Sequence, residues 1–235
     1  MTDSLSSSAR TVLGVVGITI LAFLFSLFLG FVFALLLIPL GYEPDSTFTL
    51  VGITIVSQLG FLILAYIYIR RRDLDIPLEI PSRSDLTYTG GGIVLTLITA
   101  LGLSQILSYL DLGSQSSIEK IAETNPLFLL ALAVLSLILI APSEELLFRG
   151  AVQGRLRERF EAFPSIVTAS LLFGSLHLLN YNGAIIPIIL TTLVIVVIGG
   201  ILGILYERTD NLVVPILVHS VYNFVILVPS YFAVV

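Results

Sequence analysis

The chain of 235 residues is too apolar and too sparsely charged to be a water-soluble protein. Hydrophobic residues make up 57% of it and charged residues 11%, with a mean hydropathy of +1.07, whereas a soluble domain carries about 25% charged residues. Lipid must therefore surround most of its surface, and we expect an all-α, single membrane domain over residues 1–235. The net charge of −5 argues against a nucleic-acid partner, and the lack of cysteine excludes disulfides, thiolate metal sites and cysteine nucleophiles.

Seven apolar runs predict about seven transmembrane helices, because each can cross a lipid core of roughly 30 Å. The first run is too long for the 7–15-residue apolar core of a signal peptide, so we interpret it as a retained span. Pro142 predicts a kink or break in the fourth run. Eight spans would require that the long first or fourth run be divided. The expected spans are 11–38, 47–69, 86–110, 127–148, 163–180, 184–206 and 212–234.

The basic residues predict how these spans are oriented. With the N-terminus in the cytoplasm, all arginines fall on the cytoplasmic side or at its edge, and only Lys120 falls outside. Such a bias is the positive-inside pattern. We therefore predict a multi-pass protein of the cell membrane, in contact with the lipid bilayer, with its C-terminus outside. The arginines are Arg10, Arg70, Arg71, Arg72, Arg83, Arg149, Arg155, Arg157, Arg159 and Arg208.

A few polar side chains interrupt the apolar runs of the second half of the chain. An ionised group at the bilayer centre costs about 2.5–3.5 kcal/mol on insertion scales, so such residues usually face the bundle interior and mark a functional site. Both histidines of the chain are among them. The residues are Glu144, Glu145 and Arg149 in PSEELLFRG, His177 in FGSLH, and His219 and Asn223 in HSVYN.

Helical spacing predicts which of these side chains face one another. Glu145 and Arg149 are four residues apart, so they share a helix face and can pair. His219 and Asn223 are also four apart, whereas Glu144 is turned by about 100° from its neighbour and can point elsewhere. Three helices could therefore direct Glu144, His177 and the His219–Asn223 pair into one pocket.

The side chains in this pocket favour hydrolysis by an activated water molecule. A carboxylate can serve as general base, imidazoles can transfer protons, and an amide can donate to a developing oxyanion. No serine, threonine or cysteine lies in a recognisable nucleophile motif. Amide hydrolysis fits best, since it requires a base, an oxyanion donor and a proton for the leaving amine.

The three motifs together resemble the CPBP family, the CAAX-protease and bacteriocin-processing (abortive-infection) enzymes, which include the type II CAAX prenyl endopeptidases. The motifs are Glu144-Glu145-x-x-x-Arg149, Phe173-x-x-x-His177 and His219-x-x-x-Asn223. The resemblance covers about residues 120–235, the family-like catalytic core, and leaves 1–119 as additional N-terminal transmembrane helices. It implies an all-α intramembrane endopeptidase with a cavity open to the cytoplasmic side.

The resemblance also implies a role for each matched residue. Glu144 would activate the water with help from His177, and His219 with Asn223 would stabilise the oxyanion. Glu145 and Arg149 would support the site. Members of the family have been described both as metal-dependent and as metal-free glutamate proteases.

Zinc is the only cofactor that we expect, and it could be held by Glu144, His177 and His219, because three protein ligands plus water is the catalytic pattern. The HExxH signature is absent. The expected partner is a peptide or membrane-associated protein substrate, cleaved close to the cytoplasmic membrane surface. Nothing in the sequence points to a prenyl group.

Two other functional classes remain open. One is a non-catalytic membrane partner, such as an immunity or scaffold protein with the family fold. The other is a small transporter with a Glu/His relay. For single residues a structural role is the alternative: Glu145 and Arg149 as an ion pair, Asn223 as a bond between helices, and the glycines of span six as packing sites.

Overall fold

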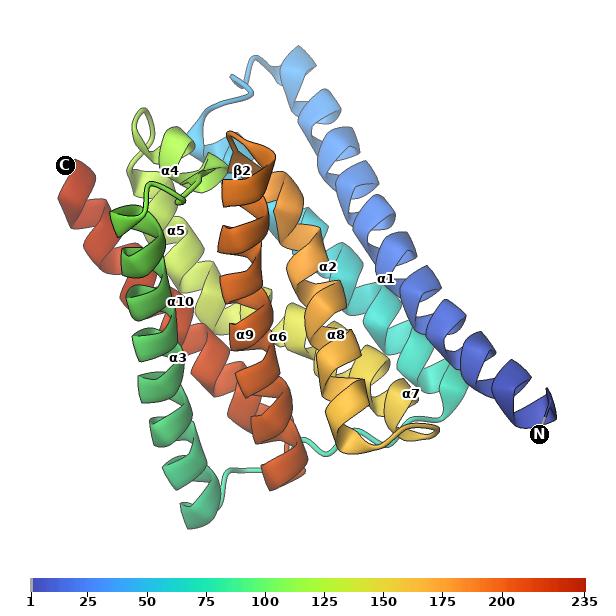
Figure 1. The fold of residues 1–235 in the computed structure, drawn as a ribbon. Helices are drawn as coiled ribbons and strands as arrows, with labels where there is room; N and C mark the ends of the chain where they lie inside the picture. Colours follow the sequence, from blue (N-terminus) through green and yellow to red (C-terminus); the bar gives the residue numbers. More distant parts are fainter. Residues whose placement is uncertain (1) are drawn as a thin grey trace.

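Seven helices of the computed structural model, which describes residues 2–235 with side chains from residue 7 onward, are long and apolar enough to cross a membrane. They confirm the predicted all-α fold and number of spans (Figure 1). Six of the spans are α1 (Thr2–Leu37), α2 (Thr47–Arg72), α3 (Arg83–Tyr109), α8 (Ala162–His177), α9 (Ile185–Thr209) and α10 (Val213–Val234). Short 3-10 turns, η1 (Ile38–Leu40) and η4 (Leu178–Asn180), extend α1 and α8.

The fourth span is one continuous helix that changes its winding at the glutamates. It comprises α5 (Leu127–Leu135), η2 (Ser136–Ile140), α6 (Ala141–Glu145), η3 (Leu146–Gln153) and α7 (Gly154–Arg157), of which η2 and η3 are π-helical. Proline lacks an N–H and crowds the preceding helical turn. The wider π turn before Pro142 accommodates it, with the N–H of Ala141 donating to the carbonyl of Ser136, five residues earlier. The helix is therefore not broken at Pro142, and it ends nine residues later than the predicted boundary at 148.

The connections gather at two opposite ends of the bundle (Figure 1). The N-terminus and the segments 73–82, 158–161 and 210–212 lie at one end, together with most of the arginines. The other end holds the C-terminus, α4 (Ser117–Ala122) and a two-stranded antiparallel ladder of β1 (Gln115–Ser116) with β2 (Tyr181–Asn182). Opposite placement of the termini is what an odd number of spans requires.

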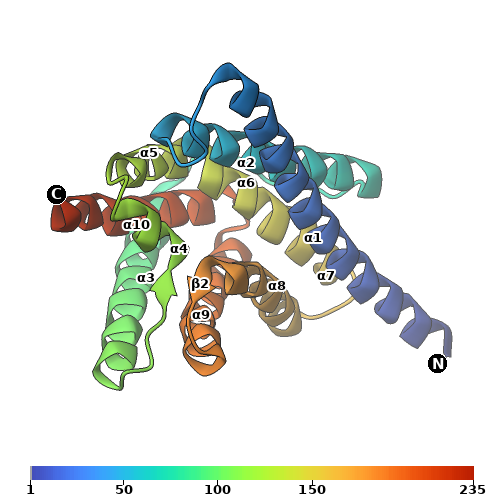
Figure 2. The same cartoon turned by 90° about the horizontal axis from the view of Figure 1, so that it is seen from above.

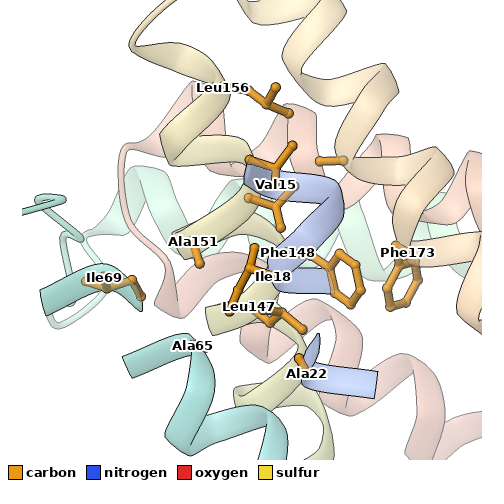
Figure 3. Close-up of a cluster of buried hydrophobic side chains, with 12 residues drawn as sticks. Val15, Ile18, Ala22, Ala65, Ile69, Leu147, Phe148, Ala151, Leu156 and Phe173 are labelled. Carbon is orange, nitrogen blue, oxygen red and sulfur yellow. The ribbon is translucent and has the colours of Figure 1, made fainter. Parts of the chain in front are cut away.

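The most extensive helix packing joins α1 with α2, α8 with α9, and α3 with α9. Figure 2 shows α1 crossing over α2 and the fourth span, with α8 and α9 side by side and α10 next to α3 and α5. The main apolar cluster joins α1, α2, the fourth span and α8, and includes Val15, Ala65, Leu147, Phe148 and Phe173 (Figure 3). Phe148 and Phe173 meet edge to face, with ring centroids 5.1 Å apart. This cluster fixes the fourth span against α8 next to the glutamates.

Two serines join α1 and α2 at mid-helix. The hydroxyl of Ser57 donates to the carbonyl of Ser26 at 3.1 Å, and the hydroxyl of Ser26 donates back to the carbonyl of Ser57. Gly60 lets the backbones approach, because a Cβ there would lie 3.2 Å from the Cα of Ser26. Small residues and interhelical hydrogen bonds are the means by which helices associate in lipid, so α2 is held in a defined position beside the fourth span.

Candidate active site

A buried ion pair forms the base of the candidate site. Arg149 and Glu145 are 1% and 0% exposed, and Arg149 Nη1 donates to Glu145 Oε1 at 2.9 Å. The same oxygen lies 2.8 Å from Nδ1 of His219 on α10. A carboxylate that is paired with arginine accepts hydrogen bonds, so Nδ1 of His219 carries the hydrogen and Nε2 points away from Glu145. Glu145 thus fixes the orientation of the imidazole.

Arg149 connects this pair to α8 and α9. Its Nη2 donates to the carbonyl of Gly199 at 2.7 Å, and its guanidinium carbon lies 5.0 Å from the ring centroid of Phe173. One turn later, Gln153 Nε2 donates to the carbonyl of Gly203 at 3.1 Å. A Cβ at Gly203 would lie 2.8 Å from Gln153 Oε1, so the absence of a side chain permits this contact. The glycines therefore have the packing role that the sequence favours.

Glu144 points away from the ion pair, as the helical spacing predicts. Its side chain is 14% exposed, and its Oε2 lies 3.9 Å from Nε2 of His219. Its Oε1 accepts a hydrogen bond of 3.1 Å from Nε2 of Gln58 on α2. Gln58 Oε1 in turn accepts from the hydroxyl of Ser143 at 2.5 Å. The two carboxylate oxygens of Glu144 therefore have different neighbours.

His177 lies at the last residue of α8. Its Nδ1 is 2.9 Å from the carbonyl oxygen of Phe173, and its ring centroid lies 4.8 Å from that of Phe173. Because a carbonyl can only accept, Nδ1 carries the hydrogen and Nε2 has a free lone pair in the neutral ring. An imidazole in this state can accept a proton.

A cavity of about 180 Å³ brings Glu144 and His177 together. This volume holds several water molecules. Its polar lining is Ser26, Ser57, Gln58, Glu144, His177 and Asn180, and its apolar lining is Phe23, Leu27, Phe61, Phe148 and Leu176. A larger hollow of about 480 Å³ between α3 and α9 has no acidic or histidine residue in its lining. The smaller cavity is thus the candidate active site.

Asn223 lies next to this arrangement rather than within it. Its Nδ2 donates to the hydroxyl of Ser136 at 3.4 Å, and neither Asn223 nor His219 belongs to the cavity lining. Ser220, on the same helix, donates to the carbonyl of Ser136 at 3.1 Å. Five of the six predicted residues therefore form one connected group through contacts or the shared cavity, and Asn223 adjoins it through the π turn of the fourth span.

The predicted ligands of zinc do not form a metal-binding cluster in this structure. Among the side chains of residues 7–235, no three histidine or acidic groups are arranged to hold a metal ion. Nδ1 of His219 and Nδ1 of His177 are both engaged by protein oxygens. Zinc at Glu144, His177 and His219 stays a prediction, and we derive no catalytic step through a metal.

Gln58 and Ser143 also belong to the site, although neither was among the residues predicted from the sequence. Gln58 comes from the N-terminal helices, where no motif marks it. The only signal was a polar Ser57-Gln58 pair within the otherwise apolar span of α2, since polar side chains within a span usually bond to another helix.

Comparison with known proteins identifies the region that carries the site. Residues 126–225 match the family described as type II CAAX prenyl endopeptidase Rce1-like. No curated protein and no solved structure matches the chain. The matched segment runs from the start of the fourth span into α10 and includes the six predicted site residues. This match of residues 126–225 confirms the resemblance noted in the motifs of the same segment.

Proposed function

We propose that the protein is an intramembrane endopeptidase that hydrolyses a peptide bond with a water molecule activated by Glu144. The observation that carries this proposal is the Glu144 carboxylate, which shares a cavity of about 180 Å³ with His177 and lies 3.9 Å from a histidine oriented by a buried ion pair. The family adds support, because its name describes a peptide-cleaving enzyme of the CAAX type.

The reaction needs only groups that this arrangement offers. Glu144 takes a proton from water, and the oxygen of that water adds to the carbonyl carbon of the peptide bond. The proton then passes to the leaving nitrogen, and the C–N bond breaks to give a carboxylic acid and an amine. His177 assists through its free Nε2. His219, carrying a hydrogen on Nε2 as well as on Nδ1, donates to the negative charge that develops on the carbonyl oxygen. Asn223 is proposed as a second donor, through the amide hydrogen that Ser136 does not accept.

Cleavage of quenched fluorescent peptides by the purified protein in detergent tests this proposal. One peptide carries a prenylated cysteine in a C-terminal Cys-a-a-X sequence, and a second carries the same sequence without the lipid. We expect Glu144→Gln to reduce kcat by at least about 10³-fold and His177→Ala by about 10²-fold. Glu123→Gln changes an exposed glutamate outside the spans, and it should leave kcat unchanged.

Wild-type activity that persists in both site variants would reject the protease proposal. Collapse of a solute gradient across sealed vesicles, lost in Glu144→Gln, would instead support a transporter. Folded wild-type protein without either activity would support a non-catalytic partner. Comparison of the prenylated and lipid-free peptides decides whether the lipid is recognised.

The proposed cleavage near the cytoplasmic surface can be tested through orientation. The cavity reaches Asn180, the residue before β2, and β2 lies at the end of the bundle that holds the C-terminus, opposite the arginine-rich end (Figure 1). A cytoplasmic N-terminus would place this end outside. The orientation predicted from the arginines therefore conflicts with a cytoplasmic opening of the cavity at Asn180. The chain has no cysteine, and single cysteines at Ile80 (96% exposed) and Tyr109 (84% exposed) report one end each.

A membrane-impermeant maleimide applied to intact cells should label Tyr109→Cys and spare Ile80→Cys if the arginine-rich end is cytoplasmic. That result would place the Asn180 side of the cavity outside and reject a cytoplasmic opening there. The reverse labelling would support cleavage at the cytoplasmic surface and reject the orientation that the arginines predict.

A further inference from the structure

Gln58 is the only contact on Glu144 that comes from the part of the chain before residue 126, among the described hydrogen bonds. Its Nε2 donates to Glu144 Oε1 at 3.1 Å, and its Oε1 accepts from the hydroxyl of Ser143 at 2.5 Å. A carboxylate can only accept, so the Gln58 nitrogen must face Glu144 and its oxygen must face Ser143. The hydrogen bonds thus fix both the position and the direction of the amide.

This contact makes the two oxygens of Glu144 unequal. Oε1 is held by Gln58, and Oε2 lies on the side of His219, 3.9 Å from its Nε2. A carboxylate side chain in a cavity can otherwise rotate and exchange its oxygens. A general base works best when one oxygen is held where the proton is taken, and a misplacement of about 1 Å can cost roughly 10²-fold in rate.

Gln58 is itself held in place by its neighbours along α2. Ser57, the preceding residue, exchanges two hydrogen bonds with Ser26 on α1. Both serines line the same cavity as Gln58 and Glu144. The position of Gln58 therefore depends on how α1 and α2 are joined at this level, and a support on a packed helix is more exact than one on a loop.

We propose that Gln58 is a positioning residue that holds Oε1 of Glu144 and so directs Oε2 toward the reacting water. The inference rests on the proposed role of Glu144 as the base. It makes α1 and α2 part of the catalytic unit, although they lie outside the segment that matches the family.

Two substitutions of similar size separate the two bonds of Gln58. Gln58→Met keeps the length of the side chain and removes both hydrogen bonds. Gln58→Glu keeps an acceptor for Ser143 and replaces the amide donor to Glu144 by a second carboxyl group, which repels Glu144 or shares a proton with it. Thr54→Val is the matched control on α2, because the hydroxyl of Thr54 donates to the carbonyl of Leu50 in its own helix and Thr54 does not line the cavity.

Infrared spectroscopy of the protein without substrate reads the contact directly. The carboxylate stretching band of Glu144 is the band lost in Glu144→Gln. We expect it to shift in Gln58→Met and in Gln58→Glu, and to stay in place in Thr54→Val. Thermal unfolding in the same detergent verifies that each variant is folded. Ser143→Ala serves as a second variant and should give a smaller shift, because it removes the bond that orients Gln58, together with a bond of the same hydroxyl to the carbonyl of Ile140 in its own helix.

Kinetics with the prenylated Cys-a-a-X peptide provides the second readout. We expect kcat to fall about 10- to 100-fold in both Gln58 variants with KM unchanged, and both constants to be unaffected in Thr54→Val. A rise in KM at constant kcat would show that Gln58 contacts the substrate and would overturn the positioning role.

The failure of this inference is distinguishable from that of the proposed function. If Glu144→Gln abolishes cleavage while Gln58→Met leaves both kcat and the infrared band unchanged, Glu144 is required and Gln58 does not position it. If Glu144→Gln still cleaves, the proposed function fails. In that case the infrared band alone decides whether Gln58 holds Glu144. The same applies if the wild type does not cleave this peptide.

Discussion

The first half of the bundle (α1 to α3) and the second half (the fourth span to α10) differ in how much of their helices is buried. In its most apolar window the fourth span has 44% of its residues buried, whereas α2 and α3 have 17% each. The polar side chains buried in the fourth span bond to α2, α9 and α10, while α3 turns most of its surface outward. Lipid is as apolar as leucine, so apolar surface alone does not drive helices together in a membrane. Specific polar contacts and close packing should therefore stabilise the second half more than the first.

Removal of the buried Arg149 should cause the largest loss of the stability that polar contacts give the second half. Arg149→Met leaves the fully buried carboxylate of Glu145 without its cation, and the loss of one partner of a buried pair costs about 3–5 kcal/mol. We expect the free energy of unfolding, measured by titration with sodium dodecyl sulfate from a mild detergent, to fall by this amount.

Arg157→Met is the control, because it removes the cation of an exposed ion pair instead of a buried one. Arg157 is 39% exposed, and its Nε lies 3.1 Å from Oε2 of Glu207. An exposed pair of this kind contributes at most about 1 kcal/mol. Equal losses in the two variants would show that burial does not distinguish the two ion pairs.

Alanine substitutions of one glycine in each half should have effects of intermediate size on the free energy of unfolding. A Cβ at Gly199 would lie 3.1 Å from the ring of Phe173 and 3.4 Å from Nη2 of Arg149, whereas one at Gly91 on α3 meets nothing within 4 Å. We expect Gly199→Ala to lower the free energy of unfolding by about 1–3 kcal/mol because the helices must separate.

Gly91→Ala should instead raise the free energy of unfolding, by about 0.5–1 kcal/mol, because alanine loses less backbone entropy than glycine in a helix. The same titration measures both variants. A stabilised Gly199→Ala would mean that α9 can move away from Arg149 at no cost.

The difference between the halves also explains which features could be predicted from the sequence. Five of the seven spans were predicted to within three residues at both ends, because apolar length is a local property. The helix α1 begins nine residues earlier than predicted, and the fourth span ends nine residues later. Glu145, Arg149 and His219 were identified because charged or titratable groups are conspicuous among aliphatic residues. Helical spacing then paired Glu145 with Arg149 correctly.

Features that depend on contacts between distant segments could not be predicted. The contact of Gln58 with Glu144 joins residues 86 positions apart and follows from how α2 packs. The π turn before Pro142 depends on backbone geometry that hydropathy does not report, so the helix was expected to kink or break there. Asn223 is four residues from His219 on α10, as noted from the sequence. Its amide nevertheless donates to the hydroxyl of Ser136, whose position depends on the π turn.

The smallest expected effect concerns the ladder of β1 and β2, one of the contacts between the two halves outside the spans. The ladder pairs Gln115–Ser116, next to the first half, with Tyr181–Asn182 of the second. Burial, and to a lesser degree the negative charge of Glu119, raises the pKa of Tyr181 to about 12. In the unfolded chain the pKa of a tyrosine is about 10. Between these values the folded protein keeps a proton that the unfolded chain loses, so the stability that Tyr181 contributes is intact below about pH 10 and falls as the pH rises toward 12.

Tyr181→Phe should therefore leave stability at pH 7 nearly unchanged and make the loss between pH 10 and 12 shallower. The measurement is the apparent melting temperature in detergent across this range. Tyr109→Phe changes a tyrosine that is 84% exposed, and it should retain the wild-type decline. If Tyr181→Phe declines as steeply as the wild type, the ladder does not hold Tyr181 in a buried state during unfolding.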